Sequence, residues 1–232
     1  MFESTVSVRH GKAAVTARRA AARRRERGDA RLAASRVLDI AIAVAVILFT
    51  LPLLAAVALA IRAQDGGPAL FAQERVGRNG RRFRCMKFRS MVLNAEARLT
   101  EVLKHDAAAR AEWARDHKLR NDPRITSIGD FLRRSSLDEL PQLFNVVRGD
   151  MSIVGPRPIV MAEIPRYGRH FEYYCAVRPG ITGLWQVSGR NDISYRRRVA
   201  MDTVYARHKS LGWDLKLLLL TIPAVLFANG SY

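Results

Sequence analysis

Two adjacent carboxylates, Asp138 and Glu139, lie among arginines in the middle of the chain: Arg133, Arg134, Arg148 and Arg157. A carboxylate can attack phosphorus only where cations neutralise the phosphate oxygens. The segment is therefore typical of covalent phosphoryl chemistry. The pattern Ser136-x-x-Glu139 is also a capping box, which by itself indicates the first turn of a helix. Both interpretations stay open and are compatible, because a helix N-terminus stabilises a carboxylate and attracts phosphate.

Further cations and a turn-rich loop lie on either side of this pair in the sequence. Lys87 and Arg89 would share one face of an extended segment, where they could clamp a diphosphate; a solvated strand face explains them equally well. The rigid turn Gly-Pro-Arg-Pro at residues 155–158 presents Arg157. Residues 179–189 offer backbone amides and an indole to a nucleotide base or sugar, and a structural turn with a buried Trp185 is the alternative.

The composition limits the classes of partner. With 39 Lys and Arg against 21 Asp and Glu, the chain carries a formal charge of +18. That charge favours polyanions, namely nucleic acid, anionic lipid headgroups or phosphorylated substrates. The sequence contains no nucleic-acid recognition motif, Walker A sequence or GxGxxG fingerprint. Cys85 and Cys175 are far apart and the five histidines form no ligand pattern, so we expect neither a disulfide framework nor a zinc site.

Residues 40–61 form an apolar run long enough to cross a hydrocarbon core of about 30 Å as a helix. Pro52 lies near its midpoint, where it removes a backbone donor and kinks or breaks the helix. Both flanks are rich in arginine, and a straight span would export one of them against the positive-inside rule. A re-entrant helix that bends at Pro52 is therefore favoured over a transmembrane span. A signal peptide would need a shorter apolar core nearer the N-terminus.

The rest of the pattern predicts one domain with appendages. We divide the chain into a basic Arg/Ala-rich tail (residues 1–35, an interfacial helix or disordered), a membrane helix (36–62) and a main domain (63–232). The expected fold class is α+β and mainly helical. The elements expected in the main domain are strands at 69–72 and 83–88 joined through Asn79-Gly80, a polar helix at 92–118, a helix at 193–208 and an interfacial or core helix at 213–227.

Six motifs follow one another in a fixed order: FAQERVG at 71–77, KFRSM at 87–91, SLDELPQ at 136–142, GDMS at 149–152, VGPRP at 154–158 and PGITGLWQVSG at 179–189. Together they closely resemble the bacterial sugar transferases, which are monotopic polyprenyl-phosphate hexose-1-phosphate transferases (phosphoglycosyl transferases). The resemblance covers roughly residues 36–232 and leaves the basic tail outside. Six motifs in the same order would very rarely occur together by chance.

The resemblance implies an enzyme that transfers a hexose-1-phosphate from a UDP-sugar to undecaprenyl phosphate and releases UMP. The expected hexose is galactose or glucose. The reaction begins exopolysaccharide, capsule or O-antigen assembly, at the cytoplasmic face of the bacterial inner membrane beside anionic phospholipid. Asp138 would be the nucleophile that forms an aspartyl-phosphosugar, and Glu139 would assist with Mg²⁺, which both carboxylates would bind. The residues assigned to phosphate oxygens are Lys87, Arg89, Arg133, Arg134 and Arg157. Those assigned to the nucleotide sugar are Thr182, Trp185, Gln186 and Arg190.

One departure from the family pattern concerns the membrane helix, which often breaks at Ser-Pro in this family. Here Leu51 precedes Pro52, and Thr50 is the nearest hydroxyl that could satisfy freed backbone groups. The length leaves no room for the extra helices and regulatory domain of longer members, so we expect the minimal catalytic form, and a homodimer is compatible with it. Two other functions stay open: a membrane-anchored scaffold without activity, and a basic nucleic-acid-binding protein, although the resemblance implies no nucleic acid.

Overall fold

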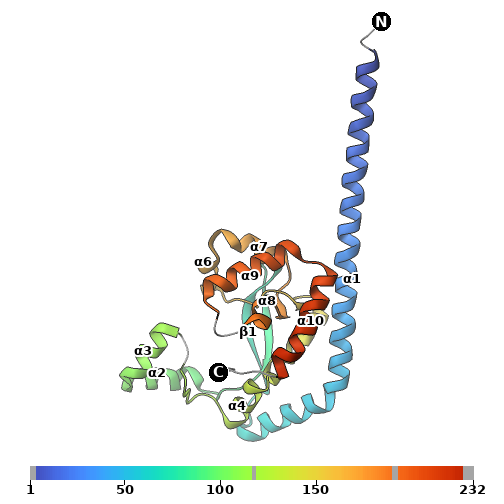
Figure 1. Cartoon of the computed structure of the whole chain (residues 1–232). Helices are drawn as coiled ribbons and strands as arrows, with labels where there is room; N and C mark the ends of the chain where they lie inside the picture. Colours follow the sequence, from blue (N-terminus) through green and yellow to red (C-terminus); the bar gives the residue numbers. More distant parts are fainter. Residues whose placement is uncertain (1–3, 117–118, 190–192, 227–232) are drawn as a thin grey trace.

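The computed structural model describes residues 4–116, 119–189 and 193–226, and within them the chain is mainly helical with two small sheets (Figure 1). The α+β class expected from the sequence is confirmed. The helices are α1 (Ser4–Asp65), α2 (Ala95–His105), α3 (Ala107–Asp116), α4 (Ser127–Arg134), α5 (Gln142–Arg148), α6 (Ile164–Tyr167), α7 (Phe171–Ala176), α8 (Leu184–Ser188), α9 (Tyr195–His208) and α10 (Leu211–Leu226). The strands are β1 (Leu70–Val76), β2 (Arg82–Phe88), β3 (Ser152–Val154) and β4 (Gly180–Thr182).

Helix α1 joins the basic tail and the apolar run in one continuous helix. Its N-terminal part projects away from the other elements, and its later part runs alongside them (Figure 1). Polar contacts of Arg36 and Asp39 attach this part of the helix to the domain. Arg36 donates to the Val146 carbonyl oxygen at 2.7 Å, and Asp39 accepts from the Ser152 hydroxyl at 2.7 Å. Ala43, one turn further on, is completely buried, so one side of α1 belongs to the core of the domain.

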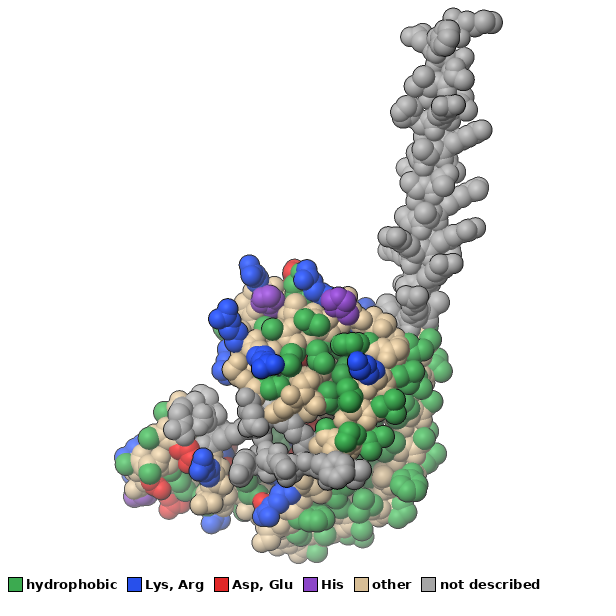
Figure 2. Space-filling view, viewed as in Figure 1, with side chains coloured by type: hydrophobic (Ala, Val, Ile, Leu, Met, Phe, Trp, Pro, Cys, Tyr) green, Lys and Arg blue, Asp and Glu red, His purple; other side chains and the backbone are tan. Residues whose placement is uncertain are grey.

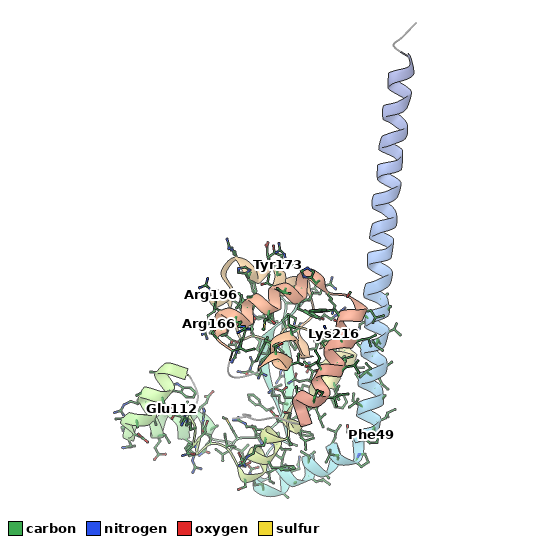
Figure 3. All side chains as sticks on the ribbon, in the orientation of Figure 1. Phe49, Glu112, Arg166, Tyr173, Arg196 and Lys216 are labelled. Carbon is green, nitrogen blue, oxygen red and sulfur yellow. The ribbon has the colours of Figure 1, made fainter. Side chains whose placement is uncertain are left out.

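The apolar part of α1 stays helical through Pro52, and Figure 1 shows that the helix changes direction sharply in its cyan part. The missing amide of Pro52 leaves the Leu48 carbonyl without its helical donor, which accounts for a bend. Thr50 donates its hydroxyl to the Val46 carbonyl at 2.7 Å, a contact that also bends helices. Phe49 points away from the domain and is 87% exposed (Figure 3).

The segment Ala33–Asp65 is long and apolar enough to cross a membrane, judged by length and composition. A break at Pro52 into two arms that return to the same membrane face stays a prediction.

The hairpin expected around Asn79-Gly80 is confirmed. Strands β1 and β2 pair antiparallel with Leu70 opposite Phe88 and Val76 opposite Arg82, so the first strand extends beyond the residues predicted for it. Asn79 and Gly80 have φ angles of 59° and 71°, the left-handed conformation for which Asn and Gly are suited. The 3₁₀ turn η1 (Arg78–Gly80) closes the hairpin.

A second sheet was not predicted. Strands β3 and β4 pair in parallel, with Ser152 opposite Gly180 and Val154 opposite Thr182. Each strand has three residues, too few for an alternating pattern to show in the sequence. The sheet holds the VGPRP turn against the 179–189 loop.

The prediction of one polar helix over residues 92–118 is wrong. Two helices, α2 and α3, replace it. They lie apart from the main body of the molecule, and the label of Glu112 in Figure 3 marks α3. Asp106 ends α2, and its Oδ1 atom accepts from the amides of Ala108 and Ala109 at 2.8 and 3.0 Å. An aspartate that caps new amides in this way starts a second helix.

The main core lies where α1, β2, α5, β3, α9 and α10 meet, around Ala43, Cys85, Val146 and Leu217. Full burial of an aliphatic side chain such as Val146 or Leu217 stabilises a fold by about 1.5–3 kcal/mol. The apolar helix expected at 213–227 is present as α10, although Phe227 lies outside the described residues. Figure 2 shows apolar side chains gathered over α10 and the neighbouring part of α1. The outward residues of α10 are Leu215, Leu219, Leu220 and Ile222.

Candidate active site

One face of the β1–β2 hairpin forms the floor of a pocket of about 340 Å³ that is open to solvent. Gln73 and Arg75 on β1 alternate with residues that point the other way, as do Cys85 and Lys87 on β2. Gln73 lies directly opposite Cys85, so these side chains emerge from the same side of the sheet. The hairpin therefore presents two cations to one cavity.

The adjacent carboxylates lie in the single 3₁₀ turn η2 (Leu137–Glu139) that faces this hairpin. The expected capping box is absent, because Ser136 has a left-handed φ of 58° and its hydroxyl makes no capping bond. A non-glycine residue in this conformation stores strain, which proteins tolerate mostly at functional sites. No long helix starts here, so the positive potential at Asp138 comes from side chains rather than from a helix N-terminus.

Lys87 bridges the two carboxylates. Its Nζ atom lies 2.6 Å from Glu139 Oε1 and 3.4 Å from Asp138 Oδ2. Arg157 approaches the same Glu139 oxygen, with 3.6 Å between Nη1 and Oε1. Asp138 is only 8% exposed, so this cluster is shielded from water on most sides. One oxygen of each carboxylate, Oδ1 and Oε2, accepts no hydrogen bond from any described residue.

The two carboxyl groups differ in acidity. Burial raises the pKa of Asp138, and the charge of Lys87 opposes that rise only in part. Burial also acts to raise the pKa of Glu139, but the positive charges of Arg157 and Lys87 outweigh it and hold the pKa below its ordinary value. Glu139 is thus the more firmly ionised group, and Asp138 is the more basic one. A basic, poorly solvated carboxylate is the better nucleophile of the two.

The arginines named from the sequence occupy different positions. Arg133 donates to the Ser90 hydroxyl at 2.9 Å, and its charge acts on Asp138. Arg134 forms an exposed ion pair with Asp130 one turn earlier in α4. Arg148 is exposed at the end of α5 and makes no ion pair with the carboxylates in the part of the chain described. Only two of these four arginines, Arg133 and Arg157, therefore act on the carboxylate pair.

Arg89 does not continue the face of Lys87, because strand β2 ends at Phe88. Its guanidinium forms a two-pronged ion pair with Asp65, with both N–O distances 2.5 Å, and donates to the Pro68 carbonyl at 2.7 Å. The side chain is buried where α1 enters β1. In this position Arg89 fixes the C-terminal end of α1 to the domain, and its assignment to phosphate stays a prediction.

The 179–189 loop contributes to the pocket through Gly180, Ile181 and Gln186. The Gln186 amide donates to the Ile181 carbonyl at 2.9 Å, while its Oε1 atom is buried without a donor among the described residues. Trp185 is buried beneath the guanidinium of Arg198, 4.5 Å from the ring centroid, as the structural alternative foresaw.

Thr182 is likewise buried and shares a hydrogen bond of 2.9 Å with Thr221 of α10. Arg190 lies outside the described residues.

Among the pocket residues missing from the sequence-based assignment are the polar side chains of Gln73, Arg75 and Gln142. Arg75 donates to the Pro158 carbonyl at 3.0 Å and so holds the turn that carries Arg157. The alternation of Gln73 and Arg75 opposite Cys85 and Lys87 is the signal that could have found the first two. Asn145, fully buried, positions the site from outside the pocket. It accepts from the Met86 amide at 2.9 Å and donates to the Arg84 carbonyl at 2.8 Å, which ties β2 to α5.

The carboxylate pair fits a magnesium ion in its donor chemistry. Mg²⁺ takes one or two carboxylates together with substrate phosphate oxygens and water. Asp138 and Glu139 each offer one oxygen that is not engaged by a described donor. No cluster of three or more His, Cys, Asp or Glu residues suited to a metal occurs in the described part of the chain. An ion here would therefore need ligands from the substrate.

Comparison with known proteins bears on this arrangement. The sequence model described as bacterial sugar transferase matches residues 30–228. The chain belongs to the bacterial sugar transferase family. The resemblance seen in the six ordered motifs is thereby confirmed.

Relatives of this sugar transferase carry informative names. The UDP-galactose-lipid carrier transferase of Erwinia amylovora is 53% identical over 197 residues, which are 85% of this chain and 41% of that protein. The exopolysaccharide production protein ExoY of Sinorhizobium fredii is 48% identical over 197 residues, 85% of this chain and 87% of that protein. The UDP-glucose:undecaprenyl-phosphate glucose-1-phosphate transferase of Caulobacter vibrioides is 40% identical over 205 residues, with 85% and 71% covered. The chain thus spans about two fifths of the first of these relatives and most of the others.

Proposed function

We propose that this sugar transferase moves a hexose-1-phosphate, galactose or glucose, from a UDP-sugar to undecaprenyl phosphate at the cytoplasmic face of the bacterial inner membrane. The names of the Erwinia and Caulobacter relatives support the donor and acceptor classes, and the name ExoY supports exopolysaccharide synthesis. The observation that carries the proposal is the buried Asp138, which Lys87 joins to Glu139 beside a pocket that Lys87, Glu139, Arg75 and Arg157 line.

In the first step, the free carboxylate oxygen of Asp138 attacks the phosphorus that bears the sugar. The bond from that phosphorus to the UMP oxygen breaks, and UMP leaves with the electron pair. Lys87 and Arg157 lie where they can neutralise phosphate oxygens as charge shifts to the leaving group. The product is an acyl phosphate between Asp138 and the sugar-bearing phosphorus.

In the second step, a phosphate oxygen of undecaprenyl phosphate attacks the same phosphorus, and the Asp138 carboxylate is released. No proton has to move in either step, because carboxylate, leaving phosphate and attacking phosphate are all anions. Magnesium held by Glu139 and substrate oxygens would supply further charge neutralisation and would leave the free oxygen of Asp138 for the attack. The apolar surfaces of α1 and α10 would keep the pocket at headgroup level, where the lipid phosphate lies.

Replacement of the nucleophile tests the proposal directly. We expect Asp138→Asn to reduce UMP release from UDP-galactose or UDP-glucose by at least about a thousandfold, because the amide cannot form the acyl phosphate. Intact-protein mass spectrometry without lipid acceptor should detect the phosphosugar adduct on the wild-type chain alone.

Asp130→Asn is the matched control, since this exposed aspartate pairs with Arg134 outside the pocket. Full turnover by Asp138→Asn would point to a different nucleophile, and the absence of UMP release from the wild-type chain would favour a non-catalytic scaffold.

A further inference from the structure

A second pocket, of about 350 Å³ including space open to solvent, lies between α1 and the main domain and shares no lining residue with the candidate active site. Its polar walls come from segments far apart in the sequence. Arg36 and Asp39 belong to α1, whereas Arg78 comes from the hairpin turn and Lys209 from the end of α9. Arg178, between α7 and β4, and Ser152 of β3 complete it.

The charges around this pocket are not balanced. Four cations line it, and Asp39 is the one carboxylate among its lining residues. Both oxygens of Asp39 are used elsewhere, since Oδ2 accepts from the Ser152 hydroxyl at 2.7 Å and Oδ1 accepts from the Ile153 amide at 3.0 Å. Within the described residues, Asp39 forms no ion pair with any of the four cations.

Two of the cations have donors to spare. Arg36 is held by the carbonyls of Val146 and Val147 at 2.7 and 3.1 Å. Lys209 donates to the Tyr205 hydroxyl at 2.7 Å and forms an ion pair with Asp214 at 3.4 Å, which balances its charge from outside the pocket lining. Arg178 uses Nε for the Gly149 carbonyl at 3.0 Å, and its two terminal nitrogens meet no acceptor among the described residues.

Arg78 is exposed and likewise donates no side-chain hydrogen bond within the part of the chain described. Burial, together with the nearby charges of Arg36 and Arg78, lowers the pKa of Arg178, so the arginines repel one another across the pocket. An anion placed between Arg78 and Arg178 would relieve this repulsion.

We propose that this pocket binds a phosphate group through Arg78 and Arg178, and that the headgroup of an anionic phospholipid supplies it. Arginine guanidinium groups match phosphate oxygens in charge and geometry. Arg36 and Asp39 directly precede residue 40, where the apolar run begins, so the pocket lies at headgroup level if α1 enters the bilayer. The phosphate site is independent of the transferase reaction; the lipid as its source rests on the membrane placement of α1.

Thermal unfolding of the full chain in a neutral detergent tests the site. The probes are short-chain phosphatidylglycerol, short-chain phosphatidylcholine and inorganic phosphate. We expect phosphatidylglycerol to raise the unfolding temperature of the wild-type chain, and the variant Arg78→Gln/Arg178→Gln to need at least about tenfold more of it for the same shift. Arg81→Gln/Arg84→Gln, the same change of charge at exposed positions of the same hairpin, should respond as the wild type does.

Each outcome decides the proposal. If inorganic phosphate acts at the same concentrations as phosphatidylglycerol, with the same dependence on the two arginines, the phosphate site stands and its source is free phosphate. Equal shifts with phosphatidylcholine, or equal responses from both double variants, would overturn the site. Arg78→Gln alone provides the test if the loss of the Arg178 contact to Gly149 unfolds the double variant, because Arg78 bonds to no described residue.

Discussion

At the scale of single residues, the site depends on one lysine that serves two carboxylates. Lys87 contacts Asp138 and Glu139 at once, and Arg157 adds a second cation on the Glu139 side only. This asymmetry separates the two groups, which are neighbours in sequence and identical in charge. Burial raises the pKa of Asp138, whereas the two cations keep the pKa of Glu139 low. The proposed roles of nucleophile and ionised partner follow from that difference.

The pH dependence of activity tests the role of Lys87. Its charge lowers the pKa of Asp138 against the larger effect of burial, so Lys87→Met should raise that pKa further. Because the reaction needs the ionised carboxylate, the acidic limb of kcat/KM for UMP release should move to higher pH. Lys87→Arg, which keeps the charge, should leave the limb in place, as should Lys104→Met on the exposed side of α2. If the acidic limb of Lys87→Met lies at the same pH as that of the wild type, the charge of Lys87 does not control the pKa of Asp138.

At the scale of elements, two short strands position the cationic turn. A Cβ atom on Gly180 would lie 2.0 Å from the Gly155 amide nitrogen, so β4 and the VGPRP turn pack backbone against backbone. Arg157 follows two residues after Gly155 and reaches Glu139 from this anchor. The hairpin supplies the opposite wall, and Asn145 joins it to α5. The site is therefore built from three elements, each too small to be stable alone.

Gly180→Ala should disturb this packing. The methyl group has no space beside Gly155, and overpacking of this kind costs about 1–3 kcal/mol or more. We expect a lower midpoint in thermal unfolding of the detergent-solubilised protein. Gly212→Ala is the matched control, since a Cβ there meets no atom within 4 Å and alanine favours the helix α10. Equal unfolding temperatures for the two variants would contradict the close approach.

At the scale of the whole molecule, α1 is both a long apolar helix and part of the domain core. Ala43, Leu54 and Ile61 of α1 are buried in the protein, whereas Phe49 and Leu59 are exposed on its other side. The exposed apolar surface of α10 adds to that side (Figure 2). We propose that this apolar surface rests in one leaflet and does not span the bilayer. The bend of α1 is the feature on which that placement depends.

Membrane topology tests the bend. A reporter fused after Arg62 should report the cytoplasm in the wild-type sequence, because both arginine-rich flanks then stay on one face. Pro52→Ala restores the backbone donor to Leu48, straightens the helix and should move part of the reporter to the periplasm. Leu51→Ala changes the neighbouring residue without a backbone effect and should match the wild type. A periplasmic signal from the wild-type fusion would show a transmembrane span instead.

The sequence predicts those elements that depend on the conformational preferences of neighbouring residues. Asn79-Gly80 specified the hairpin because both residues favour positive φ, and the apolar residues of α10 specified a helix. Residues 92–118 contain no Pro or Gly, so their composition predicts one helix, and only the capping contact of Asp106 divides it into two. The sequence does not predict strands β3 and β4, because three residues are too few to show an alternating pattern. They are strands only through their pairing with each other.

The sequence by itself determined the family, the chemical types at the site and the apolar run with its proline, since each of these is a property of residue identity and order. Only the tertiary structure decided which cations meet the carboxylates. Arg133 and Arg157 act on the carboxylate pair, whereas Arg89 is bound to Asp65 and Arg134 to Asp130. Charge and spacing cannot separate these arginines. Arg89 and Arg157 meet carboxylates that the packing of distant elements brings within a few ångströms, whereas Arg134 pairs with Asp130 one turn away in its own helix.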